Sequence, residues 1–71
     1  MRRYAVVVEH ISANYSAYVP DLPGCVASGE SVEETLANMR AAIALHLRGL
    51  REDGLPVPGP LSTTTYVEVA Q

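Results

Sequence analysis

The segment from Ser31 to Gly54 constrains the fold of this 71-residue chain more than any other part of it. Its apolar residues recur every three or four positions, the spacing of one face of an α-helix. They are Val32, Leu36, Met39, Ile43, Leu47 and Leu50. Ser31 and Glu34 predict a capping box, because the Ser31 hydroxyl can accept the Glu34 N–H while the Glu34 carboxylate reaches back to the Ser31 N–H. Gly54 supplies a helix stop, so we predict one long amphipathic helix here.

Short segments on both sides of this helix have the composition of β-strands. We predict strands over residues 3–11, 15–19 and 25–29, and a last one over residues 63–69 after a proline-rich connector. The first segment is apolar on both faces, which favours a central position in the sheet. The predicted order is βββαβ, an α+β fold in which one helix forms a second layer on a four-stranded sheet.

The length limits the chain further. We expect residues 1–71 to form a single domain, too short for a two-domain enzyme. A domain of this size has little buried surface, and a lone cysteine cannot form an internal disulfide. One helix can also cover only one face of the sheet. We therefore expect a homo-oligomer, a dimer or larger, in which a second subunit can cover the exposed sheet face. The uncovered sheet face and the edge strand of the sheet are also the candidate surfaces for binding another protein.

Charge and hydropathy narrow the choice of partners. Five basic and eight acidic residues give a net charge of −3, so direct binding to nucleic acid is not expected. No apolar run is long enough to cross a membrane, and the N-terminus lacks the apolar stretch of a secretion signal. We expect a cytoplasmic chain without membrane contact.

Residues capable of catalysis are few. Cys25 with His10 or His46 could form a nucleophile and base, but nothing in the spacing brings them together, so a buried structural cysteine is favoured. Asp21 and these three residues lack metal-ligand spacing. The acidic residues are explained mostly by the two helix ends. No catalytic, metal-binding or cofactor-binding site is predicted.

One stretch remains, Asp21-Leu22-Pro23-Gly24-Cys25, which precedes the third strand. Pro23 and Gly24 suit the two central positions of a type II turn. Together with the opening strands, the small-residue strand ending at Gly29 and the acidic helix start, this stretch resembles the HicB-like antitoxin family in its short form. The match covers residues 3–52 well and the last strand loosely.

The resemblance implies a truncated ribonuclease-H-like fold, in which a mixed sheet of order 3-2-1-4 carries one helix. It also implies an antitoxin that neutralises a small basic mRNA-cleaving toxin by direct contact. Many members continue into a DNA-binding segment; here the sequence ends at Gln71, so that activity is not carried over. The Asp21–Cys25 stretch is interpreted as a structural turn.

Two alternatives stay open from the sequence. One is a solitary oligomeric domain that binds another protein or a small ligand. The other, least favoured, is a metal-dependent enzyme acting on RNA, for which the usual cluster of carboxylates is missing. A neighbouring gene for a short basic protein would favour the antitoxin, and RNA degradation by the chain itself would favour the enzyme.

Overall fold

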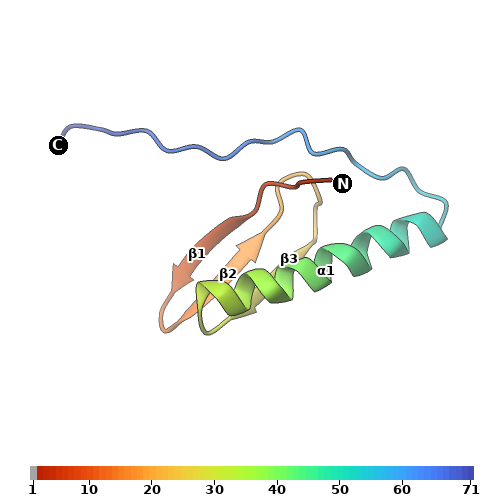
Figure 1. Ribbon diagram of the computed structural model, residues 1–71, viewed down its shortest axis with the longest axis horizontal. Coiled ribbons are helices and arrows are strands. Elements are labelled where there is room, and N and C mark those ends of the chain that lie inside the picture. Colours follow the sequence, from red (N-terminus) through yellow and green to blue (C-terminus); the bar gives the residue numbers. More distant parts are fainter. Residues whose placement is uncertain (1) are drawn as a thin grey trace.

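The computed structural model describes residues 2–71 as one sheet, one helix and a long extended arm (Figure 1). Strands β1 (Val7–Ile11), β2 (Asn14–Tyr18) and β3 (Val26–Gly29) form an antiparallel sheet of order β1-β2-β3. Helix α1 (Val32–Glu52) lies across one face of this sheet. Residues 55–71, called the C-terminal arm below, follow the helix without regular secondary structure.

The predicted four-stranded mixed sheet of order 3-2-1-4 is wrong. The sheet described has three strands, all antiparallel, and residues 63–69 of the arm are extended but not hydrogen-bonded into it. Pro56, Pro58 and Pro60 lack N–H donors, which keeps the connector extended and outside any ladder. The arm then passes residues 3–6 across an open cleft instead of pairing with them.

Strand β1 is also shorter than predicted, and among residues 2–71 it lies at an edge of the sheet and not at its centre. Its pairing with β2 stops at Val7 and Tyr18. The Val19 N–H points the other way, to the Cys25 carbonyl, so the next donor toward β1 would come from Pro20, which has none. The ladder therefore cannot extend to residues 3–6.

Helix α1 begins and ends close to the predicted residues. The Ser31 hydroxyl accepts the Glu34 N–H at 3.0 Å, while the Glu34 carboxylate accepts the N–H of Glu30 and not that of Ser31. At the other end Gly54 adopts a φ of +69°, and its N–H and that of Leu55 bond back into the last turn. This is a Schellman-type ending, which requires the left-handed conformation that glycine adopts without strain.

The core lies between α1 and the inner face of the sheet. Its fully buried apolar residues are Ala17, Val19, Leu22, Cys25 and Met39. The inward face of α1 is rotated from the predicted stripe, because Thr35 is buried while Val32 and Leu36 are half exposed. Burial of the Thr35 hydroxyl is compensated by its hydrogen bond to the Ser31 carbonyl at 2.7 Å.

Candidate binding surfaces

The Asp21–Cys25 stretch closes the core between β2 and β3. The Cys25 N–H bonds to the Leu22 carbonyl at 3.0 Å, and Gly24 between them has a φ of +84°. This is the geometry of a type II turn with Pro23 and Gly24 at its centre. Leu22 points inward and is completely buried. The stretch thus places one large apolar side chain beneath the helix.

Asp21 has a second contact that its sequence neighbourhood does not indicate. Its two carboxylate oxygens accept hydrogen bonds from the backbone N–H and the hydroxyl of Ser62, both at 2.8 Å. These bonds stabilise the ionised carboxylate, so they hold the pKa of Asp21 below its ordinary value. The turn therefore fastens the C-terminal arm, 41 positions further along the chain.

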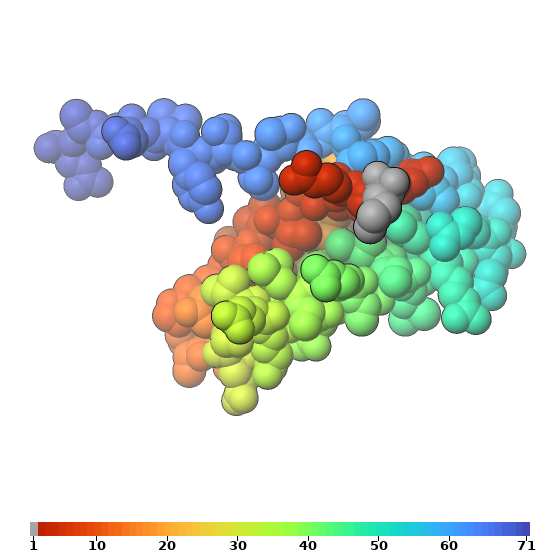
Figure 2. Space-filling view, in the orientation of Figure 1, coloured from red at the N-terminus to blue at the C-terminus, as the bar shows by residue number. Residues whose placement is uncertain are grey.

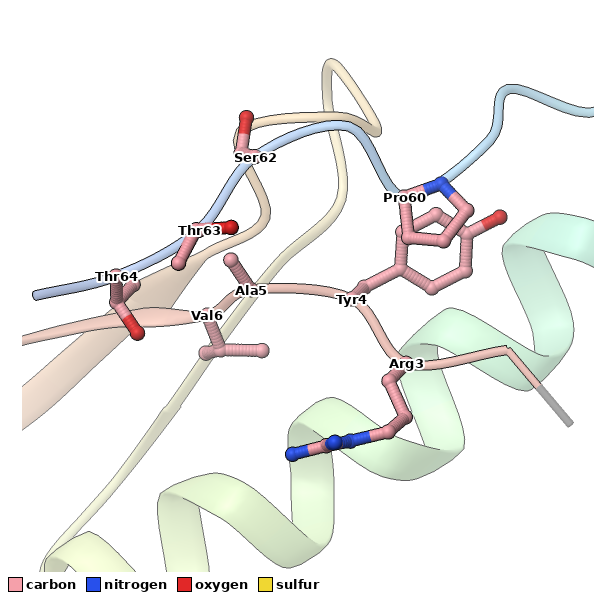
Figure 3. Close-up of a pocket in the computed structure, with 8 residues that line it drawn as sticks. All are labelled: Arg3, Tyr4, Ala5, Val6, Pro60, Ser62, Thr63 and Thr64. Atoms are coloured by element: carbon pink, nitrogen blue, oxygen red, sulfur yellow. The ribbon is translucent and has the colours of Figure 1, made fainter.

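A further attachment joins the start of the chain to the arm. The Tyr4 hydroxyl and the Arg2 guanidinium both donate to the Pro58 carbonyl. Between Pro58 and Thr64 the arm runs beside residues 3–6 and leaves an open cleft of about 430 Å³. Figure 3 shows the Pro60 ring beside the Tyr4 ring, with Thr63 and Thr64 alongside Ala5 and Val6.

We predict that Asp21→Ala will release the arm without unfolding the sheet and helix. Removing the carboxylate leaves both Ser62 donors without their acceptor, so proteases should cut within residues 58–65 faster than in the wild type. Asp21→Asn, which keeps one amide oxygen, should show an intermediate rate. Limited proteolysis with mass spectrometry measures these rates, and an unchanged rate in Asp21→Ala would contradict the prediction.

The same contact predicts a dependence on pH. Because the folded-state pKa of Asp21 is lowered, its contribution is complete above the unfolded value of about 4 and is lost as the pH falls through the folded value. The Ser62 amide resonance should therefore move only in this acidic window. Its titration by NMR checks the sign.

Cys25 and His10 lie apart in the fold. Cys25 is buried, and this burial raises the pKa of its thiol, so it stays protonated near neutral pH. His10 stacks on Tyr15 with ring centroids 4.6 Å apart. His10 pairs with Tyr15, whereas Cys25 lies beside Val19, four positions further along the chain, so His10 is about 13 Å along the sheet from Cys25. Within residues 2–71 no three His, Cys, Asp or Glu side chains gather in a way that could hold a metal ion.

The outer face of the sheet, away from α1, is an exposed surface with apolar side chains. Val7, Tyr18 and Val26 stand side by side across the three strands, as the strand register requires. Val26 is 64% exposed and Tyr18 43% exposed. Ile11 and Glu9 lie on the same face because side chains alternate along a strand. Helix α1 lies on the other face of the sheet, and Ile11, Tyr18 and Val26 remain exposed on this one, which we call the outer sheet face.

Basic side chains gather on the opposite side of the molecule. Arg2, Arg3 and Arg40 line an open groove of about 440 Å³ between residues 2–6 and α1. Its apolar wall is made by Tyr4, Val6, Leu36, Met39 and Ile43. Arg40 is distant in sequence from Arg2 and Arg3, so the fold brings it to them. Although the net charge of the chain is negative, this groove is therefore a basic surface, and it is separate from the outer sheet face.

No helix within residues 2–71 combines the length and the apolar character needed to cross a membrane. The family model described as "HicB_like antitoxin of bacterial toxin-antitoxin system" matches residues 4–71.

Several proteins are similar over much of the chain. An uncharacterized 14.9 kDa protein of Haemophilus phage HP1, encoded in the rep-hol intergenic region, is 34% identical over 64 residues. These cover 90% of this chain and 48% of the phage protein, so the chain spans about half the length of that relative. A UPF0150 protein of Helicobacter pylori is 47% identical over 49 residues, covering 69% of this chain and 68% of the relative.

The chain is also similar to a protein of known structure. The structure titled "HicA3 and HicB3 toxin-antitoxin complex" contains a chain similar to this one, with a TM-score of 0.73 and 27% sequence identity. The similarity covers 84% of this chain and 70% of that one.

Proposed function

Because the chain belongs to the HicB-like antitoxin family, we propose that it neutralises a small basic toxin that cleaves messenger RNA. It does so by direct protein–protein contact, as a non-enzymatic binding protein in the cytoplasm. The complex of a similar chain with a toxin supports a toxin partner of the HicA kind. The net charge of −3 supports it further, because opposite charges speed the association of two proteins.

The observation that carries this proposal is the outer sheet face. Its apolar side chains, Val7, Tyr18 and Val26, form one row, and Glu9 follows Val7 on the same side of β1. An apolar centre with a charged neighbour is the composition of protein interfaces. Helix α1 already occupies the other face, so this surface is free for a partner.

The experiment starts from any short basic protein encoded beside the gene for this chain. It is purified and shown to cleave RNA, and the chain is then added in equal amount. We expect cleavage to stop. Continued RNA cleavage after this chain has been added in equal amount would overturn the antitoxin role.

A matched pair of variants tests the surface. Val26→Arg introduces a positive charge on the outer sheet face, where it should repel a basic toxin and weaken binding by tenfold or more. Leu45→Arg introduces the same charge on α1, where Leu45 is 70% exposed, and should bind as the wild type does. Calorimetric titration measures both affinities. Equal affinities would show that the toxin uses another surface.

A further inference from the structure

We propose that residues 63–69 of the C-terminal arm add as a strand to the free edge of β1 in a second copy of this chain. The second copy's arm binds the first in the same way, which gives a symmetric dimer by strand exchange. This contact is separate from the outer sheet face and does not depend on the existence of a toxin.

The arm carries a strand sequence that has no sheet in its own chain. Residues 63–69 read Thr-Thr-Thr-Tyr-Val-Glu-Val, composed almost entirely of residue types that favour strands. Within the described chain their side chains are almost fully exposed: Tyr66 is 99% exposed, Val67 80% and Val69 78%. Apolar side chains in this number are costly to leave in water, so the segment is poised to bind a surface.

The unpaired edge of β1 is the surface to which the arm of a second copy would bind. On its side away from β2, no strand within residues 2–71 pairs with it, so a row of N–H and C=O groups is free. Natural proteins protect such edges with charged residues, proline or bulges. Strand β1 has no proline and no bulge in its register with β2, and Glu9 is its one charged residue. Residues 3–6 prolong the same edge as extended backbone. Strand β1 has five residues and residues 3–6 precede it, so a seven-residue strand can lie along this edge over its whole length.

The path of the arm favours a second copy over its own edge. The contacts of Pro58 and Ser62 hold the arm beside residues 3–6, and the last part of the arm, drawn in blue, diverges from β1 (Figure 1). Figure 2 shows the end of the arm projecting free of the body. The radius of gyration is 13.7 Å, against about 11 Å for a compact chain of this length. The arm is thus presented outward, where an identical edge can receive it.

Exchange between two copies is self-consistent. One two-fold axis relates the two contacts, so each arm binds the β1 edge that the other chain leaves free, and both β1 edges are then paired. Backbone pairing of this kind is the common way in which an extended segment binds a sheet.

The test uses the purified chain alone, in wild-type form and as two double variants. Val67→Pro/Glu68→Pro removes both N–H groups of adjacent positions, so a donor is lost whichever alternate set faces the edge. Ala70→Pro/Gln71→Pro makes the same change just beyond the proposed strand and serves as the matched control. Both pairs lie in the exposed arm, and circular dichroism checks that the helix is retained.

Light scattering at tens of micromolar gives the mass of each form. We expect the wild type and the control at twice the 7.6 kDa of one chain, and Val67→Pro/Glu68→Pro at the mass of a single chain. A monomeric wild type overturns the proposal, whether its arm is free or closed on its own edge. A dimer that survives in Val67→Pro/Glu68→Pro also overturns it, because the copies then meet through another surface.

Discussion

Replacing Leu22 with alanine is expected to lower the free energy of unfolding by about 3 kcal/mol, within the range measured for buried leucines. Leu22 is completely buried and is the largest such side chain in the described core. A chain of this length has a total stability on the order of 4–10 kcal/mol, so the loss is a large share of it. The melting temperature should fall by roughly 10–20 °C.

The cost is high because the site cannot collapse easily. Leu22 lies between two hydrogen bonds of the turn, from its own N–H to Val19 and from Cys25 to its carbonyl, which fix the backbone around it. The side chain is removed while the cavity walls stay in place. Thermal unfolding followed by circular dichroism measures the effect. Leu45→Ala, the same change at an exposed helix position, should shift the midpoint little, and equal shifts in both variants would contradict the assignment of Leu22 to the core.

The helix was the part of the fold that the sequence determined best. The N-cap at Ser31 and the glycine at position 54 are local signals, and both lie where the structure has the helix ends. Which face of the helix turns inward was less accessible, because Thr35 is polar in sequence yet buried in the fold. Its hydroxyl is satisfied within its own helix turn, at the Ser31 carbonyl, and a hydropathy pattern does not contain that information.

The sheet was predicted less well, for a physical reason. Two apolar faces on β1 indicated a central strand, yet the number of neighbours of a strand depends on which segments its edges meet, and these contacts are distant in sequence. Residues 63–69 have strand composition without a strand partner in the described chain. The composition of residues 63–69 therefore predicted that this segment would pair as a strand. In our strand-exchange proposal its pairing partner is β1 of a second copy of the chain.

Of the candidate site, the sequence indicated the turn but not what the turn holds. Pro23 and Gly24 specify the local geometry, since their backbone preferences act over two residues. The hydrogen bonds between Asp21 and Ser62 join residues 41 positions apart, so no local sequence pattern predicts them. The uncovered outer sheet face was expected from simple layering, because one helix can cover only one face.

Gly29→Ala is expected to destabilise the chain by about 1–3 kcal/mol, the usual cost of inserting a methyl group where there is no space. A Cβ at this position would lie 2.8 Å from the backbone nitrogen of Thr35 and 2.8 Å from its hydroxyl oxygen. Gly29 ends β3 where the first turn of α1 packs against it, so the absence of a side chain allows sheet and helix to approach closely. Neither neighbour can move away, because the Thr35 N–H and hydroxyl both bond to the Ser31 carbonyl.

Gly49→Ala, the same substitution at another position, is expected to change the stability in the opposite direction. Gly49 lies within α1, and a Cβ there would meet no atom within 4 Å. Alanine is favoured over glycine in a helix by about 1 kcal/mol, so this variant should be more stable than the wild type. Chemical denaturation measures both changes. Both substitutions replace glycine with alanine. If both changed the free energy of unfolding in the same direction, the close packing of α1 against β3 at Gly29 would not be what makes Gly29→Ala destabilising.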